Sequence, residues 1–239
     1  MADLVAVVTG ASGGIGRAIA VSLAHSGAAL CAVGRDASRL GETIAEAQVH
    51  SRALPFQADL AAKASIGQLK QLLAREFGRL DVLVHCAGVI HHNPMSLARM
   101  EDLDDQYAVD IRAPYLLTQS LLPMLKRSRG QIVFINSSLG KTAKLPEVGQ
   151  FAATQHAMKA IADSLREEVN SEGVRVLTVY PGRTATARME ALYKRQGLPY
   201  RPELLMQPQD VAAMVTAALT LPRTAEVTDI SMRPMQKSY

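Results

Sequence analysis

Three glycines near the start of the sequence could bind a phosphate-containing cofactor. Gly10, Gly14 and Gly16 lie in "VVTGASGGIGRAIA", between an apolar run and a segment with helical periodicity. Glycines placed in this way let the backbone turn tightly, approach a pyrophosphate and pack the helix against the strand. The first N–H groups and the dipole of such a helix favour phosphate. The turn therefore predicts dinucleotide binding, and a turn retained without its ligand is the alternative.

The residues after the second and third apolar runs bear on which dinucleotide would bind. Gly34 and Arg35 follow the second run, and a guanidinium there suits the 2′-phosphate of NADP. Asp36 could contact a ribose hydroxyl, but its place before a helical segment favours a helix N-cap. Asp59 and Leu60 follow the third run, where an adenine would lie. We therefore expect NADP(H) in preference to NAD(H).

The elements that would position these residues alternate between short apolar runs and helical segments. The runs cover residues 4–9, 28–33, 53–58, 81–86, 131–136, 174–180 and 226–231. Nearly continuous apolar strands separated by helices are typical of a parallel sheet covered on both faces. The sequence therefore predicts one α/β domain over residues 1–239, with a doubly wound parallel sheet of about seven strands. Residues 183–208 read as a loop with a short helix beyond a strand end, the expected position of a substrate lid.

The composition of the chain bears on partners and compartment. Lys and Arg are scattered and the formal charge is only +4, so a nucleic-acid partner is not expected. Two cysteines, Cys31 and Cys86, do not make a disulfide framework, which fits a reducing compartment. The start of the sequence has no charged leader, and no apolar run is long enough to span a membrane. We expect a cytoplasmic protein without membrane attachment.

Several motifs in a fixed order make the sequence resemble the single-domain short-chain dehydrogenase/reductase family over essentially its whole length. The segment "TGASGGIG" (9–16) matches the TGxxxGIG turn, and "INSSLG" (135–140) matches the active-site serine segment. Ala87 and Gly88 match the end of the NNAG motif, and Pro181 and Gly182 match the PG motif. The cofactor-binding residues implied by the resemblance are Gly10, Ser12, Gly14, Ile15, Gly16, Ala87, Gly88, Pro181 and Gly182.

The resemblance also implies an architecture and a mechanism. It implies a Rossmann-type sheet of seven strands and a homodimer or homotetramer built through the helices near 102–127 and 150–171. In the family, a Tyr exchanges a proton with the substrate oxygen while hydride moves to or from nicotinamide. A Lys four residues later lowers the pKa of that Tyr and holds the nicotinamide ribose. A Ser positions the substrate, and an Asn supports a water that relays protons.

This sequence departs from that pattern at the positions that perform the chemistry. Phe151 stands at the Tyr position, Gln155 at the Lys position and Asp110 at the Asn position. The serine is ambiguous, because counting back from "LG" at 139–140 selects Ser137, whereas counting back from Phe151 selects Ser138. Phe and Gln exchange no protons, and positioned acid–base catalysis contributes about 10²–10⁴-fold. Carbonyl reduction by the usual mechanism is therefore not expected.

Other side chains could supply a proton in place of the missing pair. His91 and His92 follow the NNAG-like motif, in a loop that the resemblance places beside the nicotinamide. Two exposed loop histidines without a catalytic role are the alternative. Asp110 could act as a base, favour the oxidised nicotinamide by its charge, or make only a local polar contact. No Asp, Glu or Cys has metal-ligand spacing with the histidines, so no metal site is expected.

Three functions remain open at this point. The first is an enzyme repurposed on the reductase scaffold, which binds NADP(H) and a small molecule of unknown identity but runs a non-standard or non-redox reaction. The second is a catalytically silent protein that senses NADP(H) or stabilises a partner. The third is an NADPH-dependent carbonyl reductase with a substitute proton donor.

Overall fold

Seven parallel strands form one sheet in the order β3-β2-β1-β4-β5-β6-β7. The computed structural model describes residues 1–236. The strands are β1 (Val5–Thr9), β2 (Ala29–Gly34), β3 (Ala53–Gln57), β4 (Val82–His85), β5 (Gln131–Ile135), β6 (Arg175–Pro181) and β7 (Asp229–Met232). The chain winds outward from β1 to β3 and then returns to place β4 on the other side of β1. The predicted doubly wound Rossmann-type sheet is confirmed. The direction in which successive strands are added to the sheet reverses between β1 and β4.

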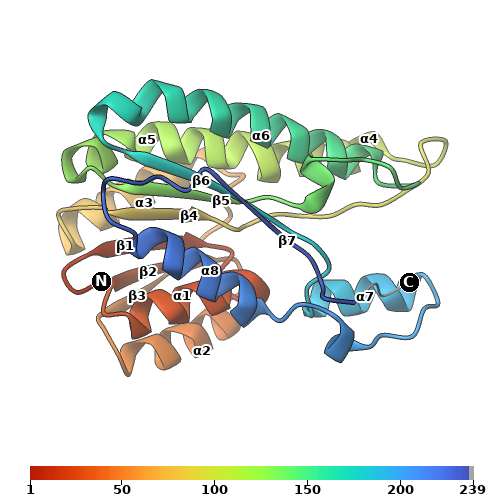
Figure 1. The fold of residues 1–239 in the computed structure, drawn as a ribbon, viewed down its shortest axis with the longest axis horizontal. Helices are drawn as coiled ribbons and strands as arrows, with labels where there is room; N and C mark the ends of the chain where they lie inside the picture. The colour runs from red at the N-terminus through yellow and green to blue at the C-terminus, as the bar shows by residue number, and fades with distance from the viewer. Residues whose placement is uncertain (237–239) are drawn as a thin grey trace.

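Helices cover both faces of the sheet (Figure 1). One layer contains α1 (Gly14–His25), α2 (Ala37–Gln48) and α8 (Pro208–Thr220). The other contains α3 (Lys63–Glu76), α5 (Ala113–Ser128) and α6 (Gly149–Val169). The short helix α4 (Met100–Tyr107) continues through a π-helical turn, η1 (Ala108–Arg112), into α5.

The apolar strands explain why both faces are covered. Side chains alternate along β1, so Val8 packs with Ile19 and Leu23 on the α1 side, whereas Val7 packs with Leu69 on the other side. Neither face of the central strands is polar, and burial of apolar surface on both sides drives the packing of the two helical layers.

The last strand differs from its prediction. The sequence predicts a strand over 226–231, but β7 begins at Asp229. The residues before Asp229 do not belong to the strand. Instead, the Glu226 carboxylate accepts a hydrogen bond from the backbone N–H of Val176 at 2.8 Å. A side-chain contact therefore replaces the first backbone pairing, which hydrophobic pattern alone does not reveal.

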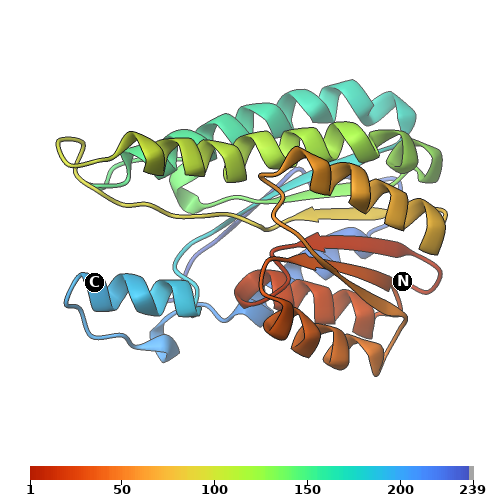
Figure 2. The ribbon, with the colours of Figure 1, turned by 180° about the vertical axis from the view of Figure 1, so that it is seen from behind.

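The segment between β6 and α8 extends beyond the carboxyl ends of the strands (Figure 2). It contains helix α7 (Ala187–Arg195) and a 3-10 turn, η4 (Pro202–Leu204). Its two ends are joined, since the N–H of Ala185 donates to the carbonyl of Met206 at 2.7 Å. The predicted loop with a short helix over 183–208 has this form. Within residues 1–236, no helix combines the length and apolar character needed to cross a membrane.

Candidate functional site

The glycine turn after β1 brings the backbone into close contact with the loop after β4. Gly10 has a φ of 68°, and a Cβ built on it would lie 2.8 Å from the backbone nitrogen of Ala87. A Cβ on Gly16 would lie 2.3 Å from the carbonyl oxygen of Gly10. Both positions exclude a side chain unless backbone moves. The turn therefore has the close approaches that its sequence predicts.

The Thr9 hydroxyl fastens this turn to the loop after β4. Its oxygen accepts hydrogen bonds from the N–H groups of Cys86 at 3.0 Å and Ala87 at 3.1 Å, and it donates to the Val84 carbonyl at 3.3 Å. These bonds fix Ala87 and Gly88 beside the glycine turn.

Ser12 carries a buried hydroxyl with no hydrogen-bond partner among residues 1–236. It leans over the end of β2, where a Cβ on Gly34 would come within 2.0 Å of its oxygen. A buried polar group without a partner costs roughly 1–3 kcal/mol. The position is therefore one where a polar group of a ligand can supply the missing bond.

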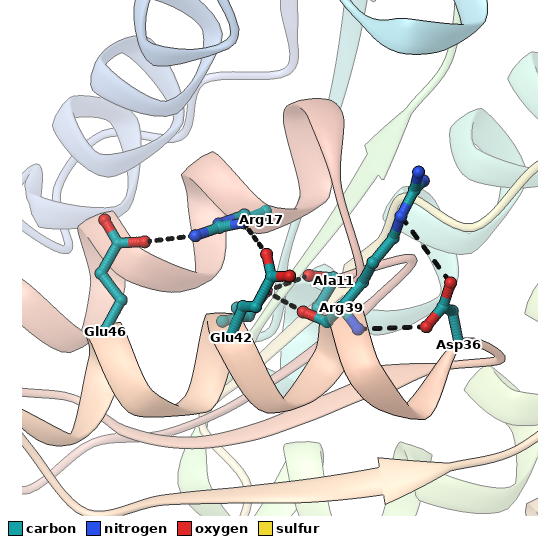
Figure 3. A network of polar contacts seen from close by, with 7 residues as sticks. Ala11, Arg17, Asp36, Arg39, Glu42 and Glu46 are labelled. Atoms are coloured by element: carbon teal, nitrogen blue, oxygen red, sulfur yellow. Dashed lines mark hydrogen bonds and ion pairs between the residues drawn. The ribbon is translucent and has the colours of Figure 1, made fainter.

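Arg35 and Asp36, at the end of β2, have different surroundings. The Asp36 carboxylate accepts a hydrogen bond from the N–H of Arg39 at 3.0 Å and caps α2, as predicted (Figure 3). Its geometry is that of a cap rather than of a free ribose acceptor. The Arg35 side chain is exposed at the edge of the cleft.

A network of polar contacts fixes α2 against α1 and the glycine turn (Figure 3). The Arg17 guanidinium on α1 pairs with Glu42 at 2.9 Å and with Glu46 at 3.1 Å. The Thr43 hydroxyl donates to the carbonyl of Ala11 at 2.9 Å. Since α2 begins directly after Arg35 and Asp36, these contacts fix the end of β2 relative to the turn.

A cleft of about 1190 Å³ lies at the carboxyl ends of the strands. The predicted cofactor residues that line it are Gly10, Ser12, Gly14, Ile15, Gly16, Arg35, Asp59, Leu60, Ala87, Gly88, Pro181 and Gly182. The residues predicted at the catalytic positions, or as substitute proton donors, that line it are His92, Asp110, Ser137, Ser138, Phe151 and Gln155. His91 lies outside this set. The fold thus gathers all but one of the predicted site residues around a single cleft.

Phe151 and Gln155 lie one turn apart on α6 and face that cleft. They are 8% and 7% exposed. The Phe151 ring packs against His92 with 5.9 Å between ring centroids. The Gln155 Nε2 donates to Asp110 Oδ2 at 3.4 Å. A hydrocarbon ring and a neutral amide therefore lie at the two positions that the resemblance predicts for the family's Tyr and Lys.

Asp110 lies in the π-helical turn η1 and points into the cleft wall. Its Oδ1 accepts from the N–H of Val89 at 2.9 Å, and its Oδ2 accepts from the Thr154 hydroxyl at 3.2 Å. Burial raises the pKa of Asp110 to about 6, against the opposing effect of the Val89 and Thr154 hydrogen bonds. At neutral pH the carboxylate is mainly ionised and held between α6 and the loop after β4.

The serine segment is held by a residue that the sequence analysis missed. Asn136 Nδ2 donates to the carbonyl of Gln155 at 2.9 Å, and its Oδ1 accepts from the N–H of Ser137 at 2.6 Å. The Ser137 hydroxyl accepts from the N–H of Leu139 at 3.2 Å, whereas the Ser138 side chain is exposed. Both serines line the cleft, so each stays a candidate.

His91 is separated from the cleft by contacts with α4. Its Nε2 lies 2.9 Å from Asp105 Oδ2, and its Nδ1 lies 3.7 Å from Asp102 Oδ1. The ring is partly exposed and held by two carboxylates. The structure therefore does not bring His91 together with Phe151 and Gln155.

His92 lies on the cleft side of the same loop. Its Nε2 is buried with no hydrogen-bond partner among residues 1–236. Burial, followed by the charge of Arg195, lowers the pKa of His92, while Glu147 opposes the shift. Of the two predicted histidines, only His92 lies against the Phe151 ring.

Two other titratable groups near the end of β4 border the cleft, and of these His85 is buried and Cys86 is half-buried. A ring nitrogen of His85, Nε2, lies 2.8 Å from the Thr118 hydroxyl, and the ring stacks on Phe134 at 4.8 Å. Burial lowers the pKa of His85 to about 3. Burial also raises the pKa of the Cys86 thiol to about 12. Neither group is charged at neutral pH, which argues for packing roles.

The segment 183–208 contacts the floor of the cleft at two places. The Arg188 Nη2 on α7 donates to the carbonyl of Gly88 at 2.7 Å. A Cβ on Gly14 would lie 3.2 Å from the Thr186 methyl group. These contacts put the start of α7 directly over the glycine turn and the loop after β4.

Three residues of the site escaped the sequence analysis. Asn136 follows β5 inside the serine motif, so its position was a usable signal. Thr154 and Arg188 have no such spacing, and only the packing of α6 and α7 brings them to the cleft. Among residues 1–236, no three His, Cys, Asp or Glu side chains group as metal ligands.

Comparisons with known proteins agree with this architecture. Residues 4–197 match the family model described as short chain dehydrogenase. A protein of Staphylococcus epidermidis described as an uncharacterized oxidoreductase is 34% identical over 235 residues, which cover 98% of each chain. This chain therefore belongs to the short-chain dehydrogenase family.

Two solved structures resemble this chain over nearly its whole length. An alcohol dehydrogenase from the archaeon Thermococcus sibiricus, complexed with 5-hydroxy-NADP, has 26% identity and a TM-score of 0.87 and covers 99% of both chains. A metagenomic short-chain oxidoreductase in complex with NADP has 28% identity, a TM-score of 0.85 and the same coverage. The NADP-type ligands belong to those proteins.

Proposed function

We propose that this protein binds NADP(H) and a small molecule in the cleft, and that it transforms the small molecule without the family's Tyr–Lys pair. The observation that carries the proposal is the union, in one cleft, of a complete glycine turn and an altered polar site. The lack of side chains at the glycines would let a pyrophosphate contact the backbone of the turn. The Ser12 hydroxyl, which has no partner among residues 1–236, could bond to a polar group of the ligand. When bound, the nicotinamide supplies or accepts a hydride.

Different residues along the cleft would bind different parts of the cofactor and the substrate. The α1 N-terminus would bind the pyrophosphate and Arg35 the 2′-phosphate, while Asp59 and Leu60 would border the adenine. Gln155 would contact the nicotinamide ribose, and Asp110 would hold a negative charge nearby. Phe151 would exclude water from the substrate. Ser137 or Ser138 would position the substrate.

Two other functions stay open, each with an observation in its favour. A catalytically silent NADP(H) sensor is favoured by the buried hydrocarbon ring of Phe151 at the proton-exchange position. A carbonyl reductase with a substitute donor is favoured by His92, whose ring is 5.9 Å from that of Phe151. We further propose that the chain forms a homodimer or homotetramer.

The first test is a thermal shift with NADPH and, separately, with NADH. A ligand that binds only the folded protein stabilises it by roughly 2.7 kcal/mol at one hundred times its dissociation constant. We expect a clear shift with NADPH and a smaller one with NADH, because Arg35 suits the 2′-phosphate. Arg35→Gln should remove the difference, whereas Arg201→Gln, an exposed residue outside the cleft lining, should keep it. No shift with either dinucleotide would refute the proposal.

A further inference from the structure

The geometry of the sheet assigns the two ends of the cleft to the two halves of a dinucleotide. Such ligands bind across the point where strand order reverses, with the pyrophosphate at the helix after the first strand. Here that point lies between β1 and β4. Arg35 lies on the β2 side, which is the adenosine end. Asp110 and Gln155 lie beyond β4 and are therefore at the nicotinamide end.

The Asp110 carboxylate accepts hydrogen bonds that oppose, without cancelling, the effect of burial, which disfavours its charged form. Both of its oxygens accept hydrogen bonds, from the N–H of Val89, from the Thr154 hydroxyl and from Gln155 Nε2, at 2.9, 3.2 and 3.4 Å. Two of these groups are N–H donors, which have no lone pair to accept a proton from a neutral carboxylic acid. The pKa of Asp110, about 6, leaves it mainly ionised at neutral pH.

No salt bridge within residues 1–236 neutralises that charge. The charged groups that act on it are Arg188 on α7, which is attractive, and Asp105 on α4, which is repulsive. Arg188 instead donates to the carbonyl of Gly88. The other elements packed against Asp110 present only the amide of Gln155, the Thr154 hydroxyl and a backbone N–H. The nicotinamide end of the cleft therefore contains a buried, unpaired negative charge.

We propose that Asp110 makes this site bind the oxidised, cationic form of the nicotinamide dinucleotide more tightly than the reduced, neutral form. The inference rests on the NADP(H) binding proposed above. The oxidised ring is a pyridinium, and opposite charges attract more strongly in a partly buried site than in water. Every other part of the two ligands is identical. The part of the preference that depends on the carboxylate of Asp110 therefore reports its charge.

The test is calorimetric titration of the full chain with NADP⁺ and with NADPH at pH 7.5. We expect NADP⁺ to bind about tenfold more tightly, since a factor of ten corresponds to a modest electrostatic difference. Asp110→Asn should lower that ratio by about the same factor. Gln155→Lys, which adds a cation beside Asp110, should lower it as well. Asp104→Asn removes the same charge from an exposed position of α4 outside the cleft lining and should leave it unchanged.

A pH series gives a second readout that does not depend on a variant folding. The ratio of the two dissociation constants should fall as the pH drops from 7.5 to 5, because protonation of Asp110 removes its charge. The 2′-phosphate also titrates in acid, but both ligands carry it, so it cancels in the ratio. In Asp110→Asn the ratio should not change over the same range.

The outcomes separate this inference from the proposed function. Tight binding of both forms, with a ratio that neither Asp110→Asn nor pH alters, would overturn the role of Asp110 and leave NADP(H) binding intact. Binding of neither form would overturn both proposals.

Discussion

The side chains of Asp110 and Gln155 bring a carboxylate and a neutral amide together at one end of the cleft. The resemblance predicts that they stand where the family motif has a neutral Asn and a cationic Lys. The sequence predicts both replacements, but it does not show that the two side chains touch across 45 residues of chain. That contact follows from the packing of α6 against the π-helical turn.

His85 gives a residue-scale prediction about acid stability. Its folded pKa, about 3, lies below the ordinary value of 6.5, so the fold favours the neutral ring. Its contribution to stability is complete above pH 6.5 and declines as the pH falls toward 3. Between pH 6.5 and 4 the wild type should lose about 3 kcal/mol of unfolding free energy through this group.

Urea unfolding across that pH range measures the effect. His85→Asn, which removes the titratable ring, should lose less stability in acid than the wild type. His50→Asn, a change at an exposed ring, should follow the wild-type curve. Equal acid sensitivity in His85→Asn and the wild type would contradict the assignment of the buried neutral ring.

The turn between β1 and α1 is the element that the sequence predicts best. Glycine is required there because backbone atoms of residues close in sequence lie too near for a side chain, as at Gly16 beside the Gly10 carbonyl. The contact with Ala87, by contrast, joins residues of two separate strands and appears only in the folded sheet.

Gly16→Ala should damage this element, whereas Gly13→Ala should not. A Cβ at Gly16 would lie 2.3 Å from a carbonyl oxygen, so we expect a loss of about 1–3 kcal/mol in unfolding free energy and no thermal shift with NADPH. Gly13 has an extended φ of 172° and no atom within 4 Å of a built Cβ. Denaturant unfolding and thermal shift of both variants measure the difference. Normal cofactor binding by Gly16→Ala would show that the turn tolerates a side chain.

At the scale of the whole molecule, the exposed faces of α4 and α5 bear on assembly. Met100, Tyr107 and Tyr115 are 65%, 56% and 52% exposed. Large apolar side chains gathered on neighbouring elements are typical of interaction surfaces. The sequence analysis expects association through the helices near 102–127, and these residues lie on or beside them.

Sedimentation measurements test this expectation. We expect a mass two or four times the chain mass of 25.7 kDa at micromolar concentration. Tyr107→Arg should shift the protein toward the monomer, because a cation on an apolar interface is costly. Val49→Arg changes an exposed apolar residue directly after α2 and should leave the mass unchanged. A monomeric wild type would contradict the expectation.

The sequence by itself determined the parallel sheet and the glycine turn, and it predicted the replacement of the Tyr–Lys pair. These features depend on residue type and on short-range periodicity, which are written directly in the chain. Only the tertiary structure decided that neighbouring His91 and His92 differ, one held by α4 carboxylates and the other packed on Phe151. It also decided the ionisation of Asp110, because burial and hydrogen-bond donors come from segments distant in sequence. Electrostatic environment is a property of packing, and packing is absent from any single stretch of residues.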